Sequence, residues 1–244
     1  MRFSIGVIGF GRFGRLAARR LSAEAAVRVF DPAAAAEEIA AAGAEPADRA
    51  GTAGSDAVVF AVPISCLEQA LREARPHLKP ETLVLDVCSV KAEPIRWMLE
   101  ILPPEVEILG THPMFGPDSA AHSLARRKIV LCPVRIGAER LDAVKARLSA
   151  RGLVVIEAAP EEHDRQIAVS LGLTHFIGRA LAEFGASEQP IDTEGYRRLL
   201  AILEVVTRDS WRLFEDMHRF NPHAAAARTG FTRALETVAA KLTG

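Results

Sequence analysis

Short apolar runs alternate with amphipathic stretches over the chain up to about residue 158. The runs predict strands at 3–8, 26–30, 57–62, 82–87, 106–109, 128–131 and 154–156. The stretches between them predict helices at 15–22, 32–42, 64–75, 93–102 and 138–150, with a loop at 44–54. The strand runs lack period-two alternation, which is typical of a sheet buried on both faces. The pattern therefore predicts an α/β fold with a doubly wound, mainly parallel sheet.

The first predicted strand is followed by a glycine-rich turn and then by a helix. The turn consists of Gly9, Phe10, Gly11, Arg12, Phe13 and Gly14. This order of strand, GxGxxG turn and helix is that of a Rossmann-type dinucleotide site. Asp31 ends the second strand, 22 residues after Gly9, where a carboxylate can accept hydrogen bonds from a ribose diol. We expect these seven residues to bind a dinucleotide.

The residue at position 31 also bears on the choice of cofactor. Asp31 favours NAD, because a carboxylate repels the ribose phosphate of NADP. Arg28, on the same predicted strand face, and the nearby Arg12 and Arg15 could neutralise that phosphate. NADP therefore stays open at this stage.

The pattern of apolar and polar residues changes at about residue 159. No further strand runs follow, and three long helical patterns cover 161–184, 193–217 and 222–242. Helices of this length cannot bury their apolar faces on one small sheet, so we expect them to pack on each other or on a second subunit. The sequence thus predicts a dinucleotide-binding domain at 1–158 and an all-helical substrate and dimerisation domain at 159–244, in a homodimer.

A histidine follows the fifth predicted strand, in the stretch G-T-H-P-M-F-G-P at 110–117. Because Pro113 lacks an N–H and restricts the residue before it, we expect His112 on a stiff loop rather than in a central strand. An imidazole, with an ordinary pKa of about 6.5, suits general acid or base catalysis near neutrality. A histidine that only braces a turn is the alternative.

A second polar segment, D-V-C-S-V-K at 86–91, follows the preceding strand. Successive parallel strands end at the same edge of a sheet, so Ser89 and His112 can converge on one cleft. Ser89 could orient the imidazole or a substrate hydroxyl, and Lys91 could hold an anion or brace the loop. The alternative is a Ser-capped helix start followed by a solvated lysine.

Composition narrows the classes of function. The 31 acidic and 30 basic residues nearly balance, which gives no sign of a nucleic-acid or membrane surface. The three cysteines at 66, 88 and 132 are odd in number and far apart, so we expect reduced thiols in a cytoplasmic protein and no zinc site. The apolar run after Met1 is too short for a signal peptide, and none approaches the roughly 20 residues of a membrane span.

Six motifs together resemble the prephenate/arogenate dehydrogenases of tyrosine biosynthesis. They are the glycine turn, D-V-C-S-V-K, G-T-H-P-M-F-G-P, E-E-H-D at 161–164, L-T-H-F-I-G-R at 173–179 and D-T-E-G-Y-R-R-L-L at 192–200. The sequence of G-T-H-P-M-F-G-P and the spacing of the last motif are most similar to those of the compact plant-type arogenate branch. The resemblance implies an oxidative decarboxylation in which a cyclohexadienol gives hydride to NAD, loses carbon dioxide and becomes a phenol, with no metal.

The resemblance also implies roles for single residues. His112 takes up the hydroxyl proton, and Ser89 orients that pair. The substrate-binding positions by motif are Lys91, Thr174, Arg179, Thr193 and Asp209. For the ring carboxylate Arg179 and Lys91 are the candidates, followed by Arg219. The resemblance leaves this choice open, because Leu171 stands where the plant-type branch has a polar residue and Glu204 lies in a helix region where some bacterial relatives have an arginine.

Asp209 separates the two substrates of the family. Arogenate carries an ammonium where prephenate carries a keto group, and a carboxylate favours the ammonium. The alternative is that Asp209 pairs with Arg208 or Arg212 on the helix surface. In that case the activity expected from the resemblance would be that of a prephenate dehydrogenase. Two further alternatives agree less well with the motifs. They are another Rossmann-fold reductase and a non-catalytic protein that senses a dinucleotide. His163 and Asp164 we interpret as a structural start of the helical domain.

Overall fold

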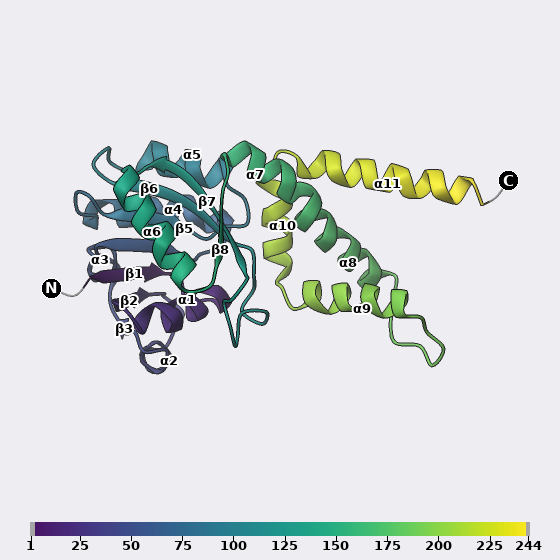
Figure 1. Ribbon diagram of the computed structural model, residues 1–244, viewed down its shortest axis with the longest axis horizontal. Helices are drawn as coiled ribbons and strands as arrows, with labels where there is room; N and C mark the ends of the chain where they lie inside the picture. The colour runs from purple at the N-terminus through teal and green to yellow at the C-terminus, as the bar shows by residue number, and fades with distance from the viewer. Residues whose placement is uncertain (1–2, 243–244) are drawn as a thin grey trace. The chain divides into compact units, whose positions relative to one another are not determined.

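The computed structural model describes residues 3–242, and the chain divides into two compact units, one up to Pro160 and one from Glu161 on. The first unit contains an eight-stranded sheet in the order β3-β2-β1-β4-β5-β6-β7-β8 (Figure 1). Neighbouring strands are parallel except β6 and β7. The doubly wound, mainly parallel sheet predicted from the apolar runs is confirmed. The strands are β1 (Ser4–Ile8), β2 (Ala26–Phe30), β3 (Glu45–Pro46), β4 (Ala57–Phe60), β5 (Leu83–Asp86), β6 (Glu107–Pro113), β7 (Lys128–Arg135) and β8 (Val154–Glu157).

Helices cover both faces of this sheet. The order runs one way from β1 through β2 and the other way from β4 through β6, so right-handed crossovers put the connecting helices on opposite faces. Helices α1 and α6 both line one pocket against the sheet and therefore share a face. The helices are α1 (Arg12–Ser22), α2 (Ala36–Ala41), α3 (Arg49–Ala53), α4 (Ile64–Ala74), the short η1 (Arg75–His77), α5 (Ala92–Ile101) and α6 (Ala138–Ala150).

The second unit is entirely helical within its described residues, as predicted, but its helices are shorter than the three long patterns. The first pattern is interrupted by a π-helical turn and the second is split in two. The helices are α7 (Pro160–Ile167), η2 (Ala168–Leu173), α8 (Thr174–Glu183), α9 (Glu194–Thr207), α10 (Trp211–Arg219) and α11 (Ala224–Ala240). No helix among residues 3–242 is long and apolar enough to cross a membrane.

Local capping explains the split of the second pattern. Ser210 has an extended backbone and its hydroxyl accepts a hydrogen bond from the N–H of Leu213 at 3.1 Å. Serine is a favoured N-cap residue because its oxygen satisfies a backbone donor that the helix cannot. A new helix therefore begins at Trp211, and Asp209 lies in the turn before it.

Two predictions in the first unit were wrong. The loop expected at 44–54 contains strand β3 and helix α3, whose N-cap Asp48 accepts from the N–H of Gly51 at 2.7 Å. His112 is not on a loop, because β6 continues through it to Pro113, with His112 opposite Val130 of β7. The pairing of β5 with β6 stops at Gly110. Beyond that point β6 has one hydrogen-bonded neighbour, so a proline without an N–H is tolerated.

Helices α8 and α9 approach closely at Gly178. A Cβ added there would lie 2.4 Å from Cγ2 of Val206, which is fully buried. Distances this short require the neighbouring helix to move. The absence of a side chain at residue 178 is therefore a condition of this helix pair.

We expect Gly178→Ala to lower the free energy of unfolding by about 1 to 3 kcal/mol through overpacking, measured by urea denaturation. Gly230→Ala is the matched control, because Gly230 is also inside a helix but has no atom within 4 Å of an added Cβ. That control should raise stability by about 0.5 to 1 kcal/mol. Equal effects of the two substitutions would show that the α8–α9 contact does not depend on glycine.

Candidate active site

The glycine turn after β1 has the geometry of a phosphate cradle. Gly9 has φ +102°, and a Cβ there would lie 2.5 Å from the carbonyl oxygen of Ala61. At Gly14 a Cβ would lie 2.2 Å from the carbonyl oxygen of Gly9, whereas at Gly11 no atom lies within 4 Å. Two glycines thus allow close packing, and the third leaves open space at the start of α1. The turn fits a dinucleotide, whose pyrophosphate would meet this helix N-terminus.

Asp31 lies directly beside the turn, as predicted. Its carboxylate accepts hydrogen bonds from the N–H of Phe10 at 2.6 Å and of Ala33 at 2.8 Å. A carboxylate offers about four acceptor positions, so two remain for ribose hydroxyls. This side chain both fixes the turn and presents negative charge where the ribose would lie.

The three arginines that could favour a ribose phosphate all lie against carboxylates. Arg12 pairs with Asp118 at 2.7 Å and Arg15 with Glu38 at 2.7 Å. Arg28 lies 3.6 Å from a carboxylate oxygen of Glu45. A phosphate would have to compete with these carboxylates, which favours a cofactor without one.

Ser89 follows β5 and His112 lies within the neighbouring parallel strand β6, with Asp86 of β5 opposite Gly110 of β6. Both side chains are buried, with 9% and 6% of their surface exposed. The Ser89 hydroxyl is buried and has no hydrogen-bond partner within residues 3–242. Because β1 runs parallel with these strands, the glycine turn lies at the same edge of the sheet.

Lys91 is held inside the first unit by contacts with Asp86 and Thr111. Its side chain is fully buried and forms an ion pair with the fully buried Asp86. The ammonium also donates to the carbonyl oxygen of Thr111 at 2.6 Å. The alternative of a solvated lysine was therefore wrong, whereas substrate binding by Lys91 stays a prediction that these contacts do not favour. Of its two roles weighed from the sequence, bracing the loop is the one the contacts favour.

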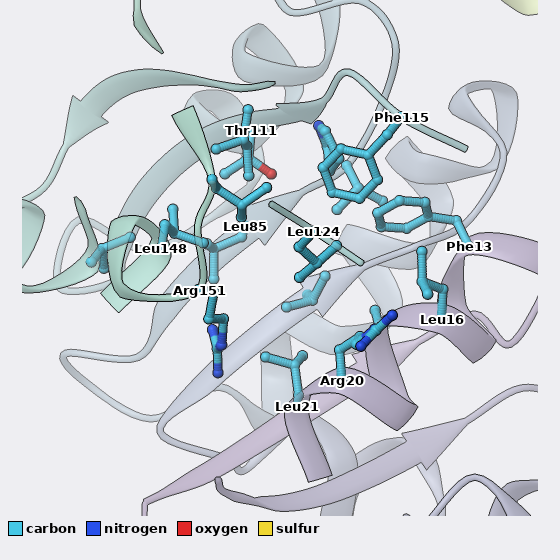
Figure 2. Close-up of a pocket in the computed structure, with 17 residues that line it drawn as sticks. Phe13, Leu16, Arg20, Leu21, Leu85, Thr111, Phe115, Leu124, Leu148 and Arg151 are labelled. Atoms are coloured by element: carbon cyan, nitrogen blue, oxygen red, sulfur yellow. The ribbon is translucent and has the colours of Figure 1, made fainter. Parts of the chain in front are cut away.

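An apolar pocket of about 160 Å³ lies on the α1 and α6 face of the sheet (Figure 2). Leu85 and Thr111 line it from the strands, and Phe13 and Phe115 close one side with ring centroids 6.2 Å apart. Successive strand side chains point to opposite faces. His112, which follows Thr111, is therefore directed away from this pocket, and the pocket is not the site of its chemistry.

In the second unit three predicted or neighbouring polar residues come together. His175 and Arg179 are one turn apart on α8, and Asp209 reaches them from the turn between α9 and α10. The His175 Nε2 atom lies 3.9 Å from a carboxylate oxygen of Asp209, and Arg179 donates to the Asp209 carbonyl at 2.5 Å. The guanidinium also lies over the ring of Trp211, and its Nε is buried without a partner in the described chain.

Burial sets the protonation of His175 and of His218, which lies on α10. Burial lowers the pKa of His175 below its usual value more than the Asp209 carboxylate raises it. Burial, together with the charge of Arg228, lowers the pKa of His218 to about 4. Arg228 lies 2.7 Å from Nδ1 of His218 and can only donate, so the ring proton belongs on Nε2. Both imidazoles are neutral at pH 7.

Thr174 and Thr193 are also predicted substrate positions. The hydrogen bonds that the structure shows for their hydroxyls are with nearby residues of the same helix or helix start. The Thr174 hydroxyl donates to the Ser170 carbonyl at 3.0 Å, and the Thr193 hydroxyl caps α9 by accepting from the N–H of Tyr196. The 14 residues of α9 separate Thr193 from Asp209, which is about 21 Å at the helical rise per residue. Within one chain these two positions are not brought together. The weaker candidate Arg219 is exposed and lies over the Phe220 ring.

His163 and Asp164 are buried in α7, with His163 Nδ1 2.7 Å from the Asp164 carboxylate. Asn221 donates to the Asp164 carbonyl at 2.8 Å and so ties α7 to the start of α11. This arrangement is consistent with the structural role predicted for the pair. No group of residues suited to hold a metal ion is found within residues 3–242.

Sequence reasoning gave no role to Asp86 or His218. Asp86 ends an otherwise apolar strand, and a carboxylate at that place is a signal that could have been used, since buried charges are found with partners. His218 had no such signal, because its contacts with Phe214 and Arg228 join residues 4 and 10 positions away across two helices.

Comparison with known proteins identifies two regions of the chain. Residues 24–157 match the family model of the prephenate dehydrogenase nucleotide-binding domain. Residues 180–244 match a model described as TYRAAT1-like, C-terminal domain. The first match covers more than half of the chain and most of the described sheet.

Two relatives come from Arabidopsis thaliana. Arogenate dehydrogenase 2, chloroplastic, is 36% identical over 195 residues, which are 78% of this chain and 54% of the relative. Arogenate dehydrogenase 1, chloroplastic, is 32% identical over 256 residues, covering 100% of this chain and 40% of the relative. The chain thus spans about half or less of the length of these two relatives.

Solved structures share the fold. A prephenate dehydrogenase from Aquifex aeolicus, in complex with hydroxyphenyl propionate and NAD+, matches with a TM-score of 0.80 and 20% identity, covering 100% of this chain and 91% of that one. The Synechocystis arogenate dehydrogenase matches with a TM-score of 0.74 and 19% identity, over 99% of this chain and 92% of that one. At these identities the likeness supports the fold alone.

The low pKa of His218 can be measured by following its imidazole proton resonance in an NMR titration. We expect a midpoint near 4. Because the unfolded histidine binds its proton near pH 6.5, stability should fall as the pH drops from about 6.5 towards 4. His218→Gln, compared with the exposed control His122→Gln, should remove this part of the decline. A midpoint near 6.5 would contradict the arrangement.

Proposed function

We propose that this chain, which belongs to the prephenate dehydrogenase family, oxidises and decarboxylates arogenate to tyrosine with NAD as hydride acceptor. The observation that carries the proposal is the parallel pair β5 and β6, which brings Ser89 and His112 to the edge of the sheet that holds the glycine turn. The identities to plant enzymes named arogenate dehydrogenase support the substrate.

The dinucleotide is held by the turn from Gly9 to Gly14 and by Asp31. The open space at Gly11 admits the pyrophosphate, and the Asp31 carboxylate accepts from the adenosine ribose. When bound, NAD supplies the acceptor for the hydride. The ion pairs made by Arg12, Arg15 and Arg28 support NAD over NADP.

His112 moves the proton of the reaction. A neutral imidazole accepts the proton of the substrate hydroxyl, so that negative charge develops on the oxygen as the hydride leaves the same carbon. The bond to the ring carboxylate then breaks, carbon dioxide leaves, and its electron pair enters the ring. The ring becomes aromatic, and His112 returns the proton to the phenolic oxygen. Ser89, whose hydroxyl has no other partner in the described residues, orients the imidazole and the hydroxyl.

Asp209 and Arg179 recognise the charged part of the substrate. Asp209 accepts from the ammonium of arogenate, which prephenate lacks. Arg179 binds a substrate carboxylate through its guanidinium, whose Nε is buried and unpaired within the described residues. Burial disfavours Lys91, and Arg219 lies exposed on Phe220, so Arg179 is the favoured candidate cation.

The proposal includes a homodimer formed by the helical unit and a cytoplasmic location. Several large apolar side chains are exposed on α9, α10 and α11, among them Val205, Trp211, Leu235 and Val238 at 53% to 63% exposure. Apolar surface of this kind is typical of a subunit interface. The widely separated cysteines support a reducing compartment.

His112→Ala should lower kcat by a factor of about 100 or more, because a general base contributes about 10²- to 10⁴-fold. The affinity for NAD, measured by titration calorimetry, should stay close to that of the unmodified chain. The control is His77→Ala, which removes an exposed histidine of the same unit. Unchanged turnover in His112→Ala would remove the proton-transfer role.

The substrate is tested by initial rates of NADH formation with arogenate and prephenate in parallel, repeated with NADP. We expect activity with arogenate and NAD, and a loss of about 10- to 150-fold in kcat/KM for arogenate in Asp209→Asn, from a charge-assisted hydrogen bond. Asp192→Asn is the control, since this carboxylate pairs with Arg197 in the same unit.

Three other outcomes would each change the proposal. Activity of the unmodified chain with prephenate alone would keep the family but remove the role of Asp209. An equal loss with both substrates in Asp209→Asn would make the residue structural. Activity with neither substrate would overturn the proposed function.

A further inference from the structure

We infer that Asp86 and Lys91 are positioning residues, which fix Ser89 and His112 relative to each other through Thr111. The catalytic use of that placement rests on the proposed function. The placement itself rests only on contacts within the first unit.

The two side chains form one buried network with the backbone. Besides its ion pair with Lys91, the Asp86 carboxylate accepts from the N–H of Cys88 at 2.9 Å and from the N–H of Thr111 at 3.3 Å. The Lys91 ammonium donates to the Thr111 carbonyl at 2.6 Å. The Thr111 hydroxyl donates to the Asp86 carbonyl at 2.5 Å. Thr111 is therefore held through its N–H, its carbonyl and its hydroxyl.

Each of these contacts ends next to a proposed catalytic residue. Thr111 directly precedes His112. Because the N–H and the carbonyl of Thr111 are both hydrogen-bonded, the backbone position of His112 is fixed. Cys88 and Lys91 flank the short segment that carries Ser89, and both are bonded to the same Asp86 carboxylate. The network thus joins the segments that carry Ser89 and His112 at one point.

Stability alone does not account for an ion pair in this place. Both side chains have no exposed surface and lie in a unit whose buried core includes Val84, Val90 and Met98. Removing two charges from water is costly, and an apolar pair of similar volume is often as stable or more so. An apolar pair could not bond to both the N–H and the carbonyl of Thr111. The network is therefore suited to fixing the geometry of the two segments.

The test is the double variant Asp86→Asn/Lys91→Met. It removes both buried charges, keeps an acceptor for the N–H of Cys88, and loses the bond to the Thr111 carbonyl. We expect kcat to fall by about 10- to 100-fold, because a shift of about 1 Å in catalytic groups can cost that much. KM for the substrate and the Kd of NAD should change little. A merely structural pair would leave kcat unchanged once the variant is folded.

A second measurement does not depend on activity. Hydrogen exchange of the Cys88 and Thr111 amides should be faster in the double variant than in the unmodified chain, because one neutral amide oxygen replaces the two carboxylate oxygens that accept from them. The control is Lys145→Met/Glu157→Gln, which removes an exposed ion pair of 2.8 Å from the same unit. This control should change neither kcat nor the exchange of those two amides.

Thr111→Val provides a test that removes no charge, in case the double variant does not fold. It deletes only the hydroxyl bond to the Asp86 carbonyl, and kcat should fall by about 2- to 10-fold with KM unchanged.

The outcomes separate the possible errors. Unmodified kcat and exchange rates in a folded double variant, or in Thr111→Val if the double variant does not fold, would overturn the positioning role. A raised KM with unchanged kcat would overturn it in favour of a direct substrate contact by Lys91. If the unmodified chain oxidises neither arogenate nor prephenate, the proposed function fails, and the exchange measurement alone decides the placement.

Discussion

The parallel pairing of β5 with β6 is the constraint on which the candidate active site depends. It sets Asp86 opposite Gly110, and so brings the Asp86 carboxylate within hydrogen-bond distance of Thr111. The pairing with β5 ends there. From Thr111 to Pro113, β6 pairs with the antiparallel strand β7 on one side and with no described strand on the other. This change of neighbours allows a strand to end in His112 and Pro113 and still hold the histidine rigidly.

Elements with a strong local signal were predicted closely from the sequence. The strand at 26–30 and the helix at 138–150 have the observed bounds, because a short apolar run and an amphipathic stretch each end at flanking residues that leave little choice. The break at Ser210 had a local signal as well, an N-cap serine before Trp211, but the continuous helical pattern around it was given more weight. Strand β3 has two residues, too few for any periodicity to show.

The parts of the site that were missed depend on contacts between distant residues. The spacing of His175 and Arg179 follows from one helix, but the approach of Asp209 requires α8 and α9 to pack at Gly178. Lys91 is a residue type that is almost always exposed. Its burial is possible because Asp86, five residues earlier in the same segment, pairs with it, and a carboxylate at the end of an apolar strand is the one local sign of that pairing. His112 was placed on a loop, since the partner that pairs with it, β7, lies 18 residues further on at Val130.

The charges of the two units are used differently. In the first unit the buried charges of Asp86 and Lys91 are satisfied by each other and by the backbone, which leaves the neutral hydroxyl of Ser89 without a partner in the described chain. In the second unit burial lowers the pKa of His175, so this imidazole does not neutralise Asp209 at pH 7. A protonated His175 at 3.9 Å would compete with any ligand ammonium for that carboxylate. The recognition of an amino group that we propose for Asp209 therefore depends on the burial of a neighbouring histidine, which no inspection of residue 209 alone would reveal.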